Sequence, residues 1–482
     1  MAAYPGFIGH SNQLQSARAD VERTVNMFVE QDTTGRPALY SIPGQRPFLT
    51  VTTDTDVRAL GSMNDRTFAV VGSTVVEVFA GGTYVVRGTV AKNDHVAQLA
   101  FGGVSGGQLL IASGDHAYSL NLTTNVLSAP VLAGEARQIG ILDGYGVALH
   151  PTTGRVRLSA LNDFSTWDPT QFALRSSQPD TWQALLVNAP DLWLLGEQTG
   201  DVWYDAGTSP FPFAPRPGAS FRYGILAPDS AIALGDSVFW LARNADGQGS
   251  VVRARGYVPQ PINSFALDTA LARYEETVSL RDAEALGCSW QGHLFYVLTL
   301  PAANATWVYD LRTGLWAEWG KWNSAHNQFD RWVPRVMCHA FETHLIGGSG
   351  SGIIATLDDQ TLTELDGGEL RRVRVPPAIP AAEGQRLIVG RFELDVDVGV
   401  GTVSGQGSDP QILMRVSYDF GKTWSSERRA ALGTIGQYGT RVAFTRCGSS
   451  DVSWLPELVL TDPAPLRLTG ASIRGSGIGR GM

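Results

Sequence analysis

The sequence predicts an all-β protein with an extended N-terminal arm, a β-propeller-like domain and a C-terminal β-sandwich. Short segments in which apolar and polar residues alternate recur along most of the chain, which is typical of half-buried strands. Turn residues separate these segments, and 54 of the 482 residues are glycine, about 11% against an average near 7%. Hydrophobic residues make up 43% and charged residues 17%, which favours many short strands around large cores.

Residues 1–50 are expected to form the extended arm. Tyr4–Gly9 and Leu39–Gly44 are rich in turn residues, whereas Val25, Met27 and Val29 recur with a period of two and indicate a strand. We expect this segment to make few apolar contacts within its own chain and to become ordered against neighbouring subunits. Deletion of residues 1–30 should then leave the propeller folded and abolish its assembly with those neighbouring subunits.

Residues 51–370 are expected to form the propeller. Hairpin units begin near residues 56, 94, 135, 180, 225, 283 and 335, and a spacing of about 40 to 55 residues is typical of four-stranded blades. The segments Ser119–Leu127 and Val308–Trp316 share a strand, an Asn or Asp turn containing Thr, and a second strand. The repeat is degenerate, so it leaves the number of blades open at six or seven. A sandwich with many hairpins would give a similar rhythm.

Residues 371–482 are expected to form the sandwich and a Gly-rich tail. The proline-rich segment Val375–Gly384 indicates a linker, because proline removes backbone donors and holds the chain extended. Alternating segments then follow at Arg391–Val398, Gln411–Ser417 and Gly439–Phe444, which suits a small β-sandwich. The tail Arg474–Met482 carries too little apolar surface to fold alone.

One local motif matches the Asp-box pattern S-x-D-x-G-x-T-W, with Ser417, Asp419, Gly421 and Trp424 at its defining positions. The aspartate is expected to bond turn amides, the glycine to permit the backbone, and the tryptophan to pack beneath the hairpin. Sialidases carry several such boxes, so a glycosidase is an alternative. We find one box, outside the propeller, and the box is not catalytic in those enzymes, which favours a structural turn.

Composition and motifs argue against most other chemistry. The formal charge of −9 leaves no basic surface overall for general nucleic-acid binding. The cysteines are far apart and form no CxxC pair, and the histidines show no paired metal spacing, so we expect no metal and no cofactor. No apolar stretch approaches 18 residues, so no membrane insertion is predicted. Thirteen tryptophans could pack between blades or stack on sugars, and packing is the simpler explanation.

Several motifs occur together in one order along most of the chain. An N-terminal group includes Glu22, Arg23, Asn26 and Glu30 and resembles the tail-hub family of short-tailed bacteriophages (podoviruses), whose members are called packaged-DNA stabilisation proteins. The other segments that carry the resemblance are Gly6-Phe7 with Gly9 and Ser11, Leu39-Tyr40 with Pro43-Gly44, Phe164–Trp167, Asp191–Gly196 with Val202-Trp203, Val238–Trp240, Gln291–His293 and Thr306–Asp310.

The resemblance implies a structural virion protein that is made in the host cytoplasm and is not an enzyme. It implies a homohexameric ring, the nozzle, below the portal and its adaptor, or head-to-tail connector, protein. This ring would contact tailspikes or tail fibres and the tail needle that plugs the channel. Genomic double-stranded DNA would pass through it at ejection without specific binding, because an acidic lining keeps phosphates from adhering. The alternative is a glycan-binding or glycan-degrading propeller of a phage tail. The resemblance leaves open the contact residues, the trigger for channel opening, the oligomeric state before docking and the host.

Overall fold

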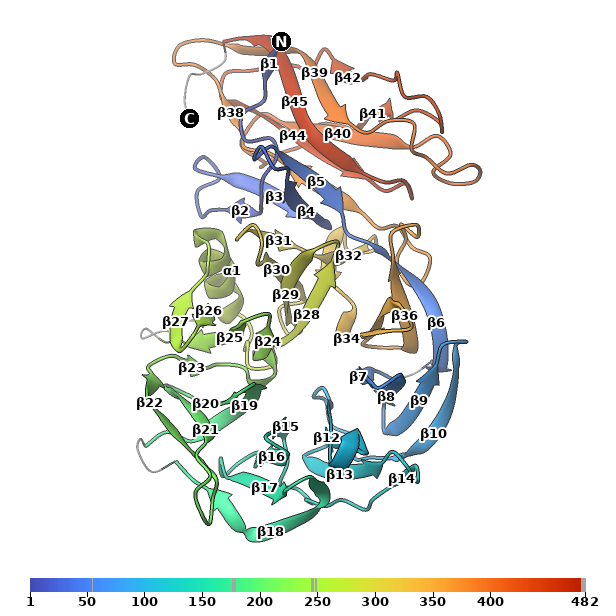
Figure 1. Cartoon of the computed structure of the whole chain (residues 1–482). Coiled ribbons are helices and arrows are strands. Elements are labelled where there is room, and N and C mark those ends of the chain that lie inside the picture. Colours follow the sequence, from blue (N-terminus) through green and yellow to red (C-terminus); the bar gives the residue numbers. More distant parts are fainter. Residues whose placement is uncertain (54, 176–178, 244–246, 248, 478–482) are drawn as a thin grey trace.

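The structure is a computed structural model that describes residues 1–53, 55–175, 179–243, 247 and 249–477. In this part of the chain, short antiparallel sheets follow one another around a ring, and a two-sheet sandwich lies against one side of the ring (Figure 1). This arrangement confirms the predicted all-β fold class, with a propeller followed by a sandwich.

The first four blades are separate antiparallel sheets in which each strand pairs with the next strand along the chain. Their strands are short because Gly, Asn or Asp residues with positive φ end many of them in tight turns. The strands are β7 (Val57–Met63), β8 (Arg66–Val71), β9 (Thr74–Phe79), β10 (Thr83–Thr89), β11 (Gln98–Gly102), β12 (Gln108–Ser113), β13 (His116–Asn121), β14 (Val126–Leu127), β15 (Gln138–Leu142), β16 (Tyr145–Leu149), β17 (Val156–Ala160), β18 (Asp163–Ala173), β19 (Trp182–Asn188), β20 (Asp191–Gly196), β21 (Gly200–Asp205) and β22 (Phe213–Phe221).

Blades five and six are joined by an α-helix, α1 (Phe265–Glu275). The helix begins after Ser264, whose hydroxyl accepts a hydrogen bond from the Leu267 amide at 3.2 Å. Leu267 and Leu271 bury its inner face against blade five. The elements here are β23 (Gly224–Ile225), β24 (Ile232–Leu234), β25 (Ser237–Arg243), β26 (Gly249–Arg255), β27 (Val258–Pro261), β28 (Glu284–Trp290), β29 (His293–Leu300), β30 (Ala305–Asp310), β31 (Trp316–Glu318) and the hairpin β32 (Gly320–Asn323) and β33 (Gln328–Arg331), with 3-10 turns at Val104–Gly106 and Pro228–Ser230.

The N-terminal strand β6 (Gly44–Thr52) closes the ring. It pairs with β36 (Gly352–Asp358), after β34 (Pro334–Ala340) and β35 (Thr343–Gly348), and completes the last blade. A side chain at Gly44 would collide with the Thr361 carbonyl, so the closure requires glycine there. The described residues therefore form seven blades, and residues 44–50, which we assigned to the arm, belong to the propeller.

Polar side chains brace the blades around the axis. Arg335 of β34 pairs with Asp56 at 2.8 Å and with Glu284 of β28 at 2.6 Å. Across the axis, Arg137 and His95 both contact the Asp229 carboxylate at 3.0 Å. The innermost strands contact one another around the ring and leave a hollow of about 230 Å³ between them.

Large aromatic side chains fill the space between neighbouring blades. Trp193 of blade four and Trp240 of blade five are both buried, with ring centroids 6.3 Å apart. Trp182 and Trp203 of blade four meet edge to face at 5.2 Å, in a cluster that also includes Leu158 of blade three. The indoles thus serve mainly as packing between sheets, where burial of such rings contributes strongly to stability.

The sandwich consists of two sheets that enclose one core. Strands from the N-terminal fifty residues take part in both sheets. The strands are β1 (Ala2–Ala3), β2 (Asn12–Gln13), β3 (Val21–Val25), β4 (Met27–Gln31), β5 (Pro37–Ser41), β37 (Arg372–Val375), β38 (Ile379–Pro380), β39 (Leu387–Val396), β40 (Gln411–Ser417), β41 (Arg428–Ala431), β42 (Val442–Thr445), β43 (Ser449–Ser450), β44 (Ser453–Leu460) and β45 (Arg467–Ser476).

The N-terminal segment is extended but does not behave as the free arm we expected. Tyr4 and Phe7 are 4% and 3% exposed and pack against Phe392 in the sandwich core. The strands β1, β4 and β5 join the sheet that contains β39 and β45. The expectation of few internal apolar contacts is therefore wrong, because these residues complete the core of a domain that begins some 370 positions later.

The predicted linker and tail also differ from expectation. Within the proposed linker Val375–Gly384, strand β38 pairs with β44, so part of this segment belongs to the sandwich. The tail begins inside β45, which pairs with β39 as far as Ser476. Its last residues, 478–482, lie outside the described part of the chain.

A buried carboxyl group near the ring closure makes the stability of the fold depend on pH. Glu364 is 3% exposed and accepts a hydrogen bond of 3.1 Å from Gln45 of β6, and burial raises the pKa of Glu364 to about 7. An unfolded chain ionises this group near 4.5, so the free energy of unfolding should fall as pH rises from about 4.5 to about 7.

We predict that Glu364→Gln stabilises the protein at pH 8 by about 2–3 kcal/mol and flattens its stability between pH 4.5 and 7, since the glutamine stays neutral and still accepts from Gln45. Thermal unfolding of both proteins across this pH range measures the difference. Asp359→Asn, at an exposed residue five positions away, serves as the control. Parallel pH profiles for wild type and Glu364→Gln would contradict the assignment.

Candidate functional site at the propeller–sandwich junction

Strand β3 connects the two domains through backbone pairing. It lies parallel to β31 of blade six at Val25 and antiparallel to β37 of the sandwich along Arg23–Val25. The resulting eleven-stranded sheet runs from blade six into the sandwich without interruption. The link to β31 is one residue pair long, whereas the link to β37 spans three, so β3 ties the two domains together at this point. Figure 1 shows β3 between β31 and the sandwich strands.

Glu22 of β3 takes part in a buried ion pair. Its carboxylate accepts a hydrogen bond of 3.2 Å from Arg374 of β37. The same guanidinium is fully buried and donates to the carbonyls of Gly6, Phe7 and His10 and to Thr24. Burial raises the pKa of Glu22, and the charge on Arg374 acts against this rise. The pair therefore ties the N-terminal loop to the sandwich.

Gly9 makes room for this ion pair. A Cβ atom at residue 9 would lie 2.6 Å from the Glu22 carboxylate and 3.0 Å from the Arg374 guanidinium. Any side chain here would displace one of the two charged groups. The turn-rich N-terminal sequence is thus required by the packing of the junction.

Arg23 reaches from β3 towards blade six. Its guanidinium donates to both carboxylate oxygens of Glu318, at 2.7 and 3.1 Å, and lies over the ring of Phe329. Ser11 donates to the same carboxylate at 3.0 Å. Burial by itself would lower the pKa of Arg23, because it disfavours the charged form. The negative charge and hydrogen bonds of Glu318 outweigh this effect, so the pKa of Arg23 is raised. This ion pair crosses from the N-terminal segment to the propeller.

Asn26 holds three segments together at the end of β3. It is buried with φ of 56°, a conformation that asparagine tolerates better than most residues. Its amide donates to the carbonyls of Gly320 and Arg371 at 2.8 and 2.9 Å and accepts from the Gly320 amide at 2.9 Å. Glu30, the fourth motif residue, lies apart from this group in the β4–β5 hairpin, opposite Ala38.

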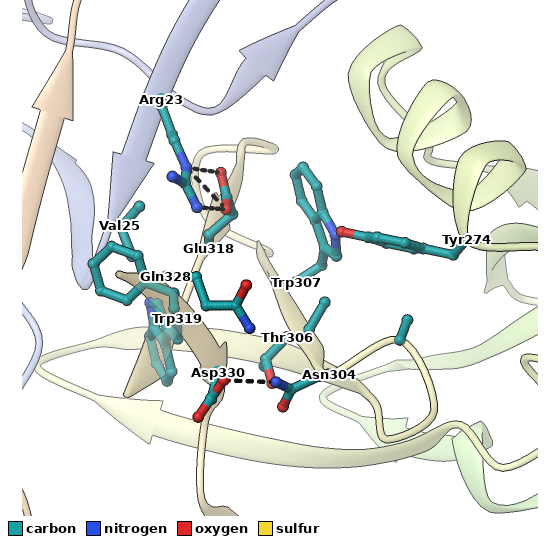
Figure 2. Close-up of a pocket in the computed structure, with 13 residues that line it drawn as sticks. Arg23, Val25, Tyr274, Asn304, Thr306, Trp307, Glu318, Trp319, Gln328 and Asp330 are labelled. Atoms are coloured by element: carbon teal, nitrogen blue, oxygen red, sulfur yellow. Dashed lines mark hydrogen bonds and ion pairs between the residues drawn. The ribbon is translucent and has the colours of Figure 1, made fainter. Parts of the chain in front are cut away.

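A polar pocket of about 180 Å³ opens beside this junction (Figure 2). Its walls come from β3, α1, blade six and the β32–β33 hairpin. The Arg23–Glu318 pair lies at one end, and Asp330 with Asn304 lies at the other, where the Asn304 amide donates at 2.7 Å. The Gln328 side chain projects between them.

The Asp-box residues form a closed turn between β40 and β41. The Asp419 carboxylate accepts hydrogen bonds from the Ser417 hydroxyl and from the Lys422 and Thr423 amides, at 2.7 to 3.0 Å. The Thr423 hydroxyl and these other donors lower the pKa of Asp419 to about 2. Gly421 has φ of 88°, which few other residues adopt. Trp424 packs against a buried cluster that includes Val25 and Leu455, and the Arg415 guanidinium lies 4.8 Å from its ring.

Burial raises the pKa of the Cys288 and Cys338 thiols to about 12, which leaves them unreactive at neutral pH. Within the described parts of the chain, no three His, Cys, Asp or Glu side chains converge to hold a metal ion. No helix among the described residues has the length and apolar character to cross a bilayer.

The structure also identifies residues that the sequence analysis missed. Arg374 and Glu318 provide the partners of Glu22 and Arg23, yet they lie 352 and 295 positions away from them. One signal was present, because Arg372 and Arg374 alternate with valines in a short strand just before two prolines. Charged residues at alternate positions of an apolar strand usually face solvent, so their burial could not be inferred from the pattern alone.

Comparison with solved structures finds chains of low similarity. PorZ of Porphyromonas gingivalis, described as a surface component of the type-IX secretion system, is 11% identical with a TM-score of 0.38 over 72% of this chain, which spans 44% of PorZ. BamB from Moraxella catarrhalis is 9% identical with a TM-score of 0.35, over 62% of this chain and 93% of BamB. The dihydro-heme d1 dehydrogenase NirN is 12% identical with a TM-score of 0.40, over 77% and 78% of the two chains. No curated protein sequence matches the chain.

Comparison with sequence families gives two matches, one for each domain. The model described as Bacteriophage P22 Gp10, beta-propeller, matches residues 22–362. The model described as Bacteriophage P22 Gp10, beta-sandwich, matches residues 376–476. The boundary between them falls where the structure passes from blade seven to the sandwich, and the first match includes Glu22, Arg23, Asn26 and Glu30. With both domains matched in order over most of its length, the chain belongs to the bacteriophage P22 Gp10 family, the tail-hub or DNA-stabilisation proteins of short-tailed phages.

Proposed function

We propose that this protein forms the wall of the tail hub, extends the DNA channel below the head, helps to retain packaged DNA and lets it pass at ejection. The observation that carries the proposal is the match of both domains to one tail-protein family. The continuous sheet through β3 supports it, because a wall under the pressure of packaged DNA needs domains that do not move against each other.

The small volume of the hollow at the propeller axis supports a channel built from several copies of the protein. The axial hollow measures about 230 Å³ and is crossed by the ion pair of Arg137 with Asp229. A DNA duplex is too wide to enter this hollow, since the major groove of a duplex alone is about 12 Å wide. A conduit made of this protein must therefore lie between subunits, and a closed ring of six copies is the arrangement we propose.

The proposal assigns the protein a mechanical role and no catalytic one. The carboxylates of the junction pocket are held by neighbours, Glu318 by Arg23 and Asp330 by Asn304 and Asn323. In the virion, the ring would contact the portal adaptor, the tailspikes or tail fibres, and the needle. Membership of the family, which implies association with other components of the virion tail, supports these proposed contacts.

We expect phage particles made without this protein to package DNA and then lose it, because the channel would lack its lower wall. The measurement is the DNA content of particles purified from a host infected with a nonsense mutant in this gene. Adding the purified protein to freshly packaged particles should restore both DNA retention and infectivity. Mutant particles that keep their DNA as well as wild-type particles would contradict the proposed role.

A further inference from the structure

We propose that the pocket beside the junction (Figure 2) binds one neutral sugar unit. Its volume of about 180 Å³ equals roughly six molecules of liquid water at 30 Å³ each, which is room for a single sugar ring. This site would give the hub a second function, recognition of a saccharide, that is independent of its role in holding DNA.

The polar groups of the pocket suit hydroxyl groups, which both donate and accept hydrogen bonds. Gln328, on the exposed side of the β32–β33 hairpin, donates to Asp330 and offers its amide oxygen and its second N–H to a ligand. The Asp330 carboxylate accepts from Asn304 and Asn323, one on each oxygen, and also from Gln328, which leaves one of its four lone pairs for a ligand. Arg23 uses its Nε and Nη2 atoms on Glu318, which leaves its Nη1 donors for a ligand.

An aromatic wall stands opposite these polar groups. Trp307 of β30 and Tyr274 of α1 meet end to edge along the pocket, with the Tyr274 hydroxyl at the indole nitrogen of Trp307, which is 5% exposed. Sugar rings present apolar C–H groups on one face and hydroxyls around the edge. The aromatic wall of the pocket suits the C–H face of a sugar, and the convergent amide, carboxylate and guanidinium groups suit its hydroxyls.

The charges of the pocket favour a neutral ligand over an ion. Arg23 and Glu318 neutralise each other at 2.7 Å, and Asp330 adds one negative charge. An anionic sugar or a phosphate would be repelled by Asp330 and would find no uncompensated cation. A cation would meet Arg23, whose charge faces the same space.

Saturation-transfer NMR on the full-length protein tests this site with glucose, galactose, mannose and rhamnose, and with sialic acid as the anionic probe. At least one neutral sugar should bind with a dissociation constant of about 1 mM. Gln328→Ala should weaken that binding about tenfold, since a lost hydrogen bond of about 1.4 kcal/mol corresponds to that factor. Tyr274→Phe, which removes only a hydroxyl group, should weaken it less.

Gln198→Ala is the matched control, because this glutamine lies on an exposed turn of blade four and should bind sugar as the wild type does. Melting temperatures establish that each variant is folded. The proposal is overturned if none of the neutral sugars binds, if Gln328→Ala binds as tightly as wild type, or if sialic acid binds best. None of these outcomes bears on DNA retention, so the result leaves the proposed function to its own test.

Discussion

Deletion of residues 1–25 is expected to unfold the sandwich and leave the propeller folded. The deletion removes β1 and β3 together with Tyr4 and Phe7 from the sandwich core, whereas β6, which closes the propeller, is retained. Loss of a single buried phenylalanine costs about 3–5 kcal/mol, and a whole domain is stable by only about 5–15 kcal/mol. Limited proteolysis should therefore degrade residues beyond about 371 and spare a fragment that contains the blades.

A point variant separates lost packing from the loss of chain. Phe7→Ala should destabilise the sandwich by about 3–5 kcal/mol, because Phe7 is 3% exposed and contacts Phe392. The control is Tyr438→Ala, in the same domain, where the tyrosine is 73% exposed and the change should be within about 0.5 kcal/mol. A truncated protein with a sandwich as resistant as that of the full chain would show that the N-terminal segment is indeed a dispensable arm.

Arg374→Met is expected to destabilise the junction by about 3–5 kcal/mol. The variant leaves the Glu22 carboxylate buried without its cation, and it removes the donors that the carbonyls of Gly6, Phe7 and His10 use. Chemical denaturation followed by tryptophan fluorescence measures the loss, since Trp454 lies in the adjoining core.

Arg386→Met provides the control for this variant. Arg386 is also in the sandwich region, but its side chain is 63% exposed and lies 3.9 Å from an exposed Asp451. Such a surface pair contributes about 0–1 kcal/mol, so the control should unfold almost as wild type does. Equal stabilities for Arg374→Met and Arg386→Met would mean that the buried ion pair does not hold the N-terminal loop.

The sequence revealed the elements that depend on local patterns. The hairpin units expected near residues 56, 94, 135, 180, 225, 283 and 335 correspond to first strands that begin at residues 57, 98, 138, 182, 224, 284 and 334. Alternation and turn residues act within a few positions, so they can be recognised without knowledge of the fold. The period-two signal at Val25 to Val29 likewise falls on β3 and β4, which are separated by the turn at Asn26.

The sequence could not reveal the pairing of distant segments. Nothing near β6 indicates that it completes the last blade some 300 residues later, or that β3 joins β31 and β37. The junction depends on such contacts, because each of Glu22, Arg23 and Asn26 finds its partners about 290 to 350 positions away. The motif residues could be selected by resemblance, but their structural role required the coordinates.

Cryo-electron microscopy of the intact virion tests the central proposal most directly. We expect a closed ring of six propeller–sandwich subunits below the portal adaptor. Duplex DNA or the needle should lie on the axis between subunits, and no DNA should pass through an individual propeller. A virion without this protein, or one that carries it only on the outer tailspikes, would contradict the proposal that it forms the wall of the channel.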